Sequence, residues 1–285
     1  MDADYVYSGI EVFENEIFDL IVIAGTPWIW DQFHLSIKWK NLVKIINTHN
    51  YSKKLFFGIG SCFFPEDEYL EIAERPAEQD AMREIYTGAK VIVRDWIAFN
   101  KLTKAGVNCE LLVCPSYFCY GIQPIVPTKS NENVLIWYDP TIGISSVGWK
   151  KQTKLEEYLN LNLEYFKEYK PTVYTHLPSE IKAANYIGLP EPKLIGGWRN
   201  TLSIMQNANY VLSGRVHCYV PAFVQGKPCG LLSVDSRSRV VSDFGGTVIS
   251  NINQFKNLGY QFRNFDLYLN RYKDILKEIM NEECI

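Results

Sequence analysis

The sequence has no hydrophobic run long enough to cross a bilayer and no excess of positive charge. Its longest apolar block, Phe18 to Trp30, is interrupted by Asp19 and is too short for a transmembrane helix. Lys and Arg number 29 against 32 Asp and Glu, which gives a net charge of −3. Because broad binding to nucleic acid requires clustered positive charge, this balance predicts no nucleic-acid partner.

The sequence also shows neither the cysteine pattern of a disulfide framework nor the residue pattern of a secretory leader. The seven cysteines are an odd number scattered over 285 residues, which is typical of reduced thiols. Met1 is followed by Asp2 and Asp4 instead of a basic and then an apolar stretch, so we expect no signal peptide. With an acidic pI near 5.9, these features predict a cytoplasmic protein with at most peripheral membrane contact.

Several nucleotide, metal and nucleophile motifs are not present. The sequence contains no Walker A loop, no G-x-G-x-x-G fingerprint and no G-x-S-x-G elbow. Cys109, Cys114 and Cys119 recur every five residues, whereas a zinc site uses close pairs of cysteines. We therefore expect neither a metal ion nor a cofactor.

Short apolar runs alternate with helical patterns through most of the chain, which predicts α/β layers built on parallel sheets. The expected strands are 20–24, 55–59, 90–93, 110–113, 134–138, 172–175, 210–212 and 229–232. We expect the first of them, 20–24, to be buried. The expected helices are 35–46, 66–86, 96–104, 154–169, 179–186, 200–207, 215–225 and 266–280.

A polar stretch that contains Pro124 and Pro127 separates two such halves, and Gln123 to Asn133 is the expected linker. This division predicts an N-terminal α/β domain over 1–125 and a C-terminal α/β domain over 133–265. The last helix, within 266–285, could cross back to the first domain. Two Rossmann-like domains of this kind would place a cleft between the carboxyl ends of their strands.

Basic residues follow the expected strands. Arg215 and His217 begin a helix directly after a strand that ends at Ser213, where the helix dipole favours an anion. Arg94 follows the strand 90–93 in the first domain. Since histidine exchanges a proton readily near neutral pH, His217 is the candidate catalytic residue. The alternative is a buried histidine with Arg215 in a structural ion pair.

Four further residues are candidates for substrate binding. Arg237 and Arg239 follow the strand 229–232, His176 ends the strand 172–175, and Trp28 follows a glycine turn in the first domain. Their structural alternatives are a solvated basic loop, a hydrogen-bonded histidine and a core tryptophan. Arginines at strand ends in both domains predict a ligand with two anionic groups.

Four stretches, taken in order, resemble the polysaccharide pyruvyl transferase family. They are Asp19 to Pro27, Val91 to Asp95, Val113 to Ser116, and Ser213 to His217 with Gly226 to Pro228 beyond it. The resemblance implies a two-domain fold like that of GT-B glycosyltransferases. It also implies transfer of pyruvate from phosphoenolpyruvate to a sugar of a surface polysaccharide or glycan, as a ketal, with release of phosphate.

By the same resemblance, Arg94, Arg215 and His217 match the family's functional positions, and Arg237 is the nearest match to a later basic residue. The arginines would hold the carboxylate and phosphate of phosphoenolpyruvate, and His217 would protonate its methylene carbon. The implied partners are phosphoenolpyruvate, as donor substrate, and a sugar or lipid-linked oligosaccharide acceptor.

Two other hypotheses remain open. A GT-B-type glycosyltransferase could bind the diphosphate of a nucleotide-sugar donor with the same arginines. A non-catalytic relative could bind a glycan or an anion without turnover, although the presence of both Arg215 and His217 weighs against it.

Overall fold

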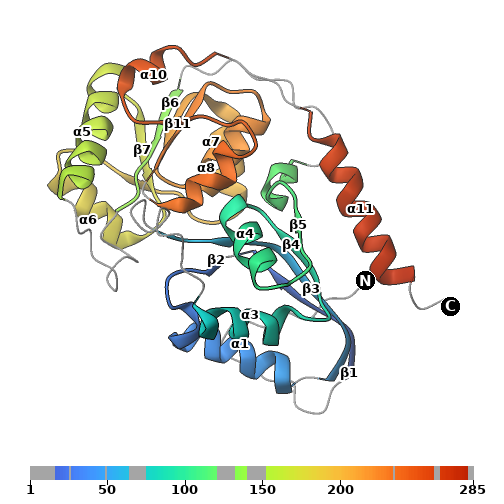
Figure 1. The fold of residues 1–285 in the computed structure, drawn as a ribbon. Coiled ribbons are helices and arrows are strands. Elements are labelled where there is room, and N and C mark those ends of the chain that lie inside the picture. Colours follow the sequence, from blue (N-terminus) through green and yellow to red (C-terminus); the bar gives the residue numbers. More distant parts are fainter. Residues whose placement is uncertain are drawn as a thin grey trace. The chain divides into compact units, whose positions relative to one another are not determined.

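The computed structural model describes residues 17–25, 27–48, 50–63, 75–120, 132–139, 152–233, 235–259 and 264–281. The chain divides into two compact units, each built on its own parallel sheet (Figure 1). The first unit comprises residues 1–114, 235–237 and 270–285, and the second comprises residues 115–234 and 238–269. The expected α/β class with parallel sheets is confirmed.

The first unit has a sheet of order β1-β3-β4-β5, with β2 paired to β3. Its strands are β1 (Ile17–Ala24), β2 (Pro27–Ile29), β3 (Asn50–Ser61), β4 (Lys90–Val93) and β5 (Glu110–Leu111). Its helices are η1 (Phe33–Leu35), α1 (Ile37–Thr48), α3 (Pro76–Tyr86) and α4 (Trp96–Lys104), and most of η3 (Ser236–Ser238) and of α11 (Asp266–Asn281) also belongs to it.

Helices cover both faces of this first sheet. On β3, the ring of Phe56 packs against Tyr86 of α3 at 4.5 Å between centroids, and Phe57 packs against Tyr272 of α11 at 4.9 Å. Because successive side chains of a strand point to opposite faces, α3 and α11 lie on opposite sides of the sheet (Figure 1). The first unit is therefore a three-layer α/β structure.

One detail of the first unit differs from the expectation. Among the described strands, β1 pairs only with β3, and Val22 is 49% exposed, so the apolar run at 20–24 forms an edge strand of the described sheet and not a buried one. The helix expected over 66–86 is described only from Pro76, where proline occupies the first helical turn of α3. The earlier part of that expected helix, 64–74, lies outside the described residues.

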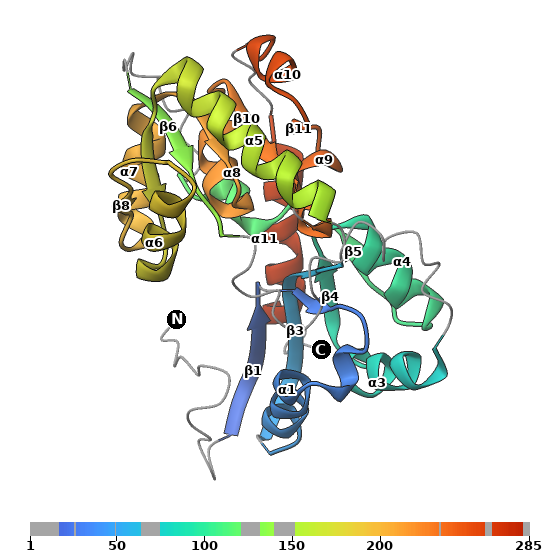
Figure 2. The ribbon, with the colours of Figure 1, turned by 90° about the vertical axis from the view of Figure 1, so that its left-hand side faces the viewer.

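The second unit has a parallel sheet of order β11-β10-β9-β6-β7-β8. Its strands are β6 (Glu132–Ile136), β7 (Thr172–Thr175), β8 (Lys193–Leu194), β9 (Ala208–Ser213), β10 (Cys229–Leu232) and β11 (Val248–Ile249). Its helices are η2 (Pro115–Phe118), α5 (Gln152–Tyr169), α6 (Pro178–Tyr186), α7 (Trp198–Asn207), α8 (Val216–Val224), α9 (Arg239–Ser242) and α10 (Ile252–Lys256). Figure 1 and Figure 2 show α5 on one side of this sheet and α8 on the other.

The expected end of the first domain, at residue 125, and the expected start of the second, at residue 133, stay predictions. The expected linker, 123–133, falls mostly on residues 121–131, which lie outside the described residues. Two segments from late in the sequence belong to the first unit. They are Asp235–Arg237 and the part of α11 that follows residue 269, whereas residues 266–269 of α11 belong to the second unit.

Candidate functional site

Three neighbouring strands of the second unit end at the same edge of the sheet. Ile136 of β6 pairs with Ser213 of β9 and with Tyr174 of β7, and all three strands are parallel. The residues that follow these strands therefore meet: the guanidinium of Arg215 lies 4.6 Å from the ring centre of Tyr138. His176, after β7, is close enough for the charges of Arg215 and His217 to act on its imidazole.

Ser213 and Gly214 shape the turn that presents Arg215. The Ser213 hydroxyl accepts a hydrogen bond from the Arg215 N–H at 3.0 Å and donates one to the Arg215 carbonyl at 2.8 Å. The Gly214 N–H donates to the carbonyl of Ile136 at 3.0 Å, which fixes the turn to β6. A Cβ on Gly214 would lie only 2.9 Å from the Cβ of Tyr138 and closer still to the Tyr158 hydroxyl, so only glycine fits.

Gly214→Ala is accordingly expected to lower the free energy of unfolding by about 1–3 kcal/mol, because the added methyl group overpacks a buried turn. Urea titration of the variant measures this loss. Gly197→Ala is the matched control, since a Cβ there meets no atom within 4 Å. Equal stabilities of the two variants would contradict the steric argument.

Glu180, in the first turn of α6, connects the three strand ends. Its carboxylate is fully buried. Oε1 accepts hydrogen bonds from Arg215 Nη2 at 2.5 Å and from the Asp139 N–H at 3.2 Å. Oε2 accepts from the N–H groups of His176 and Leu177, both at 3.0 Å. A buried carboxylate is tolerated when it is paired and hydrogen-bonded in this way, so Glu180 fixes the position of Arg215 relative to β6 and β7.

Glu180 was not among the expected site residues, although the sequence contains a signal for it. We expected α6 to begin at Ser179, but Leu177 is the N-cap and Pro178 the first helical residue. Proline at the first helical position and glutamate at the third are the usual pattern of a helix start. That pattern would have placed the Glu180 carboxylate beside the N–H groups that precede the helix.

Arg215 uses only part of its guanidinium within the protein. Nη2 is bonded to Glu180, whereas Nε is buried and has no hydrogen-bond partner among the described residues. The side chain is 24% exposed, so the group is accessible from one side. An anion that approaches this side would meet an arginine fork already held in place, which suits a carboxylate or a phosphate.

Two histidines accompany Arg215 and differ in their surroundings. His217 is the second residue of α8 and is exposed. His176 is half-buried, and its Nε2 lies 2.9 Å from Sγ of Cys218. Burial lowers the pKa of His176 below its ordinary value, and the positive charge of Arg215 lowers it further, while Glu180 opposes the shift. His176 is therefore neutral near pH 7.

Arg94 lies in the first unit at the carboxyl end of β4. It is 3% exposed, and its side chain crosses Gly60, where a Cβ would come within 2.7 Å of Nε. The adjacent Asp95 caps α4 by accepting the Ala98 N–H at 2.8 Å, and it also accepts the N–H of Ser61 at 2.8 Å. The end of β4 is thereby tied to the end of β3 beneath the Arg94 guanidinium.

Arg237 and Arg239, two residues apart, belong to different units. Arg237 lies in the first unit, where its Nε donates to both carboxylate oxygens of Asp235 at 2.8 and 2.9 Å. The Ser236 N–H donates to the carbonyl of Phe63 at 2.6 Å, which anchors this segment just beyond β3. Arg239 begins α9 in the second unit, is exposed, and lies 3.6 Å from Asp243.

Trp28 occupies the core of the first unit. It is 4% exposed, and the ammonium group of Lys38 lies 4.8 Å from its ring centre. A sugar platform needs an open ring face, which this indole does not offer. The structure favours the core interpretation of Trp28 over the expected role in substrate binding.

Of the predicted residues, His176, Arg215 and His217 meet in the second unit, whereas Arg94 and Arg237 belong to the first. That the two groups act on one ligand stays a prediction. In the described part of the chain, no group of three or more His, Cys, Asp and Glu residues is arranged to hold a metal ion. No described helix combines the length and apolar character needed to cross a bilayer.

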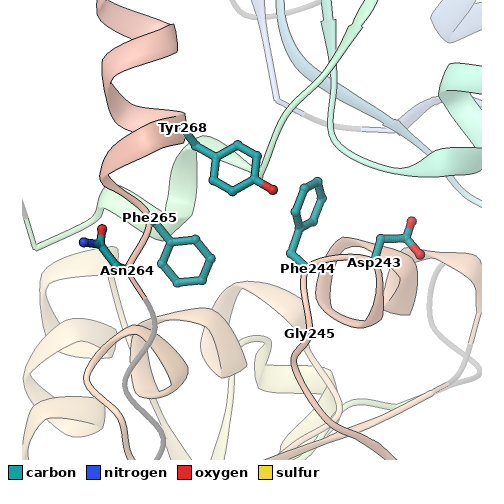
Figure 3. A pocket seen from close by; sticks show the side chains of 6 residues that line it. All are labelled: Asp243, Phe244, Gly245, Asn264, Phe265 and Tyr268. Carbon is teal, nitrogen blue, oxygen red and sulfur yellow. The ribbon is translucent and has the colours of Figure 1, made fainter.

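A separate hollow of about 440 Å³ lies in the second unit (Figure 3). It is lined by Asp243, Phe244, Gly245, Asn264, Phe265 and Tyr268. Figure 3 shows the rings of Phe244, Phe265 and Tyr268 gathered around it, and the rings of Phe244 and Tyr268 meet edge to face at 5.7 Å. The predicted site residues are not part of its lining.

Comparison with solved structures shows which fold the chain has. Methanocaldococcus jannaschii UDP-GlcNAc 2-epimerase, in complex with UDP-GlcNAc and UDP, matches with a TM-score of 0.54 and 12% identity, over 87% of this chain and 71% of that one. A Listeria monocytogenes protein assigned as a UDP-N-acetylglucosamine 2-epimerase matches with a TM-score of 0.54 and 11% identity, over 93% and 74% of the two chains. The chain therefore has the GT-B fold, as expected.

The sequence then identifies the family. The family model for polysaccharide pyruvyl transferase matches residues 3–236, which is most of the chain. The chain belongs to the polysaccharide pyruvyl transferase family and is a transferase. No curated protein matches it in sequence.

Proposed function

We propose that this protein transfers the pyruvyl group of phosphoenolpyruvate to two hydroxyls of one sugar in a surface polysaccharide or glycan. The product is a ketal, and phosphate is released. The observation that supports this most is Arg215, which is fixed by a buried carboxylate while its Nε has no hydrogen-bond partner among the described residues, next to His217 at the start of α8.

Phosphoenolpyruvate carries a carboxylate and a phosphate on the same carbon. The exposed side of Arg215 and the amino end of α8 suit one of these groups, because both present N–H donors and positive potential. We assign the other group to Arg94 and Arg237 of the first unit. Both are fixed by neighbouring residues, so little conformational entropy would be lost when they bind.

His217 supplies the proton in this mechanism. A protonated imidazole transfers its proton to the methylene carbon of phosphoenolpyruvate, and the adjacent carbon becomes electrophilic. One sugar hydroxyl attacks that carbon and loses its proton, the phosphate leaves, and the second hydroxyl closes the ketal and loses its proton. One of the two released protons returns to His217 and the other remains with phosphate or solvent. General acid catalysis of this kind contributes roughly 10²–10⁴ in rate.

The acceptor is a sugar or a lipid-linked oligosaccharide, and a lipid-linked acceptor requires only peripheral contact with a membrane. The donor is a cytoplasmic metabolite, which agrees with a cytoplasmic location. The reaction as written needs no cofactor, since His217 and the arginines supply the proton and the positive charge.

Phosphate release from phosphoenolpyruvate, measured across a panel of sugar acceptors, tests the proposed function. We expect release that depends on one class of acceptor, and binding of phosphoenolpyruvate by isothermal titration. Arg199→Gln is a control that removes a positive charge from an exposed position of α7. Binding of UDP-GlcNAc but not phosphoenolpyruvate would favour the glycosyltransferase instead. Glycan binding without any turnover would favour the non-catalytic relative.

A further inference from the structure

A buried thiol contacts the imidazole beside Arg215. Cys218, in the first turn of α8, is 1% exposed, and its Sγ lies 2.9 Å from Nε2 of His176. Burial raises the pKa of this thiol to about 12, so the sulfur keeps its proton at neutral pH. The pair is thus a neutral thiol against a neutral imidazole and does not resemble an activated cysteine nucleophile.

The position of the protons follows from hydrogen-bonding capacity. A neutral imidazole has one N–H donor and one nitrogen acceptor, whereas a thiol is a weak donor and a weak acceptor. If Nε2 accepts the S–H proton, the buried S–H is satisfied by its only hydrogen-bond partner among the described residues. If Nε2 carried the proton instead, the S–H would be left without an acceptor. The contact therefore favours the tautomer of His176 that is protonated at Nδ1.

The other side of the ring is available to a ligand. Nδ1 of His176 makes no hydrogen bond with the described part of the chain, whereas the backbone N–H of the same residue is already bonded to Glu180. His176 also lies within electrostatic range of Arg215 and His217, the groups assigned above to the substrate. A neutral N–H at this point can donate to an anionic oxygen without adding a further positive charge.

We propose that Cys218 is a positioning residue that fixes His176 as an Nδ1–H donor, and that this N–H binds a phosphate or carboxylate oxygen held by Arg215. The inference rests on the proposed function for the identity of that oxygen. It separates the two histidines by role: His217 transfers a proton, and His176 donates a hydrogen bond without transferring one.

Nitrogen NMR of histidine-labelled protein tests the tautomer directly, without any turnover. We expect His176 to be protonated at Nδ1 in the wild type, and the population protonated at Nε2 to rise in Cys218→Ala. Cys229→Ala is the matched control, because it removes another buried thiol of the same unit that is not bonded to His176. Protonation of His176 at Nε2 in the wild type would overturn the proposal, as would a tautomer that is unchanged in Cys218→Ala.

The ligand contact is tested with inorganic phosphate and with two substitutions of His176. An asparagine amide nitrogen can occupy the place of Nδ1, whereas a glutamine amide reaches the place of Nε2. We expect His176→Asn to bind phosphate nearly as the wild type does, and His176→Gln to bind it roughly 10- to 100-fold more weakly, as for a lost hydrogen bond to a charged group. Equal affinities of the two variants would contradict the contact.

The same titration separates this inference from the proposed function. Phosphate is shared by phosphoenolpyruvate and by the diphosphate of a nucleotide sugar. If phosphate shifts the Nδ1–H signal of His176 but phosphoenolpyruvate is not turned over, the proposed function fails and the assignment of His176 stands. If phosphoenolpyruvate is turned over and the Nδ1–H signal does not respond to phosphate, the assignment of His176 fails alone.

Discussion

A His217→Ala variant is expected to release phosphate from phosphoenolpyruvate about 10²–10⁴ times more slowly than the wild type. The methylene carbon of phosphoenolpyruvate must gain a proton before the adjacent carbon accepts a sugar hydroxyl, and water is a poor substitute for a positioned acid. Since His217 is exposed at the second position of α8, its removal leaves no cavity and should not change the free energy of unfolding.

Single-turnover measurement of phosphate release gives the rate of the chemical step, and isothermal titration gives the affinity for phosphoenolpyruvate. The expected pattern is a large loss in rate with an affinity within a few-fold of the wild type, because Arg215 is unaltered. Tyr186→Ala is the matched surface control, since this side chain is 92% exposed at the end of α6. Wild-type phosphate release by His217→Ala would show that the proton comes from another group.

Much of the fold could be predicted because residues close to each helix or strand determine where that element begins and ends. The limits of β4, α4, β7 and β10 match the expected 90–93, 96–104, 172–175 and 229–232. At α4, Asp95 caps the amino end and a glycine with positive φ, Gly106, follows the carboxyl end. Strands β2, β8 and β11 were missed because two or three residues contain no periodicity.

The candidate site could be predicted only where the sheet itself determines it. His176 and Arg215 follow parallel strands that flank β6 on either side, so an ordering of strands is enough to place them at the same edge of the sheet. Glu180 was missed because its partners are the backbone N–H groups and guanidinium of other elements, which only the tertiary structure brings near. Arg237 lies in the first unit and Arg239 in the second, because hydrogen bonds between Ser236 and Phe63 hold the residues directly before Arg237 to the first unit.

Glu180→Ala is expected to cause the largest loss of stability, about 3–5 kcal/mol, because it leaves Arg215 partly buried without its counter-charge. Three backbone N–H groups would lose their acceptor at the same time. The variant that remains folded should also bind phosphoenolpyruvate more weakly, since the carboxylate that holds the Arg215 guanidinium in place would be gone. Urea unfolding and isothermal titration measure the two effects separately.

Glu78→Gln provides a control for the loss of any buried carboxylate. Glu78 is 2% exposed in the first unit and accepts the Gln32 N–H at 2.7 Å, so its substitution should also cost stability. It belongs to a different unit from Arg215, and the affinity for phosphoenolpyruvate should stay within a few-fold of the wild type. If both variants lose stability and both keep the affinity, Glu180 supports the fold and does not position Arg215.

A double-mutant cycle that combines Glu180→Ala with Arg215→Ala measures the interaction energy between the two side chains. Each single substitution strands one buried charged group, whereas the double substitution removes both charges together. The double variant should therefore be destabilised by less than the sum of the two single losses, with a coupling of roughly 0.5–3 kcal/mol. The three N–H groups left by Glu180 stay unsatisfied in either background, so they cancel in the coupling. Additive losses would mean that the 2.5 Å contact between Arg215 and Glu180 contributes little, and that the arginine is held by its stacking on Tyr138 instead.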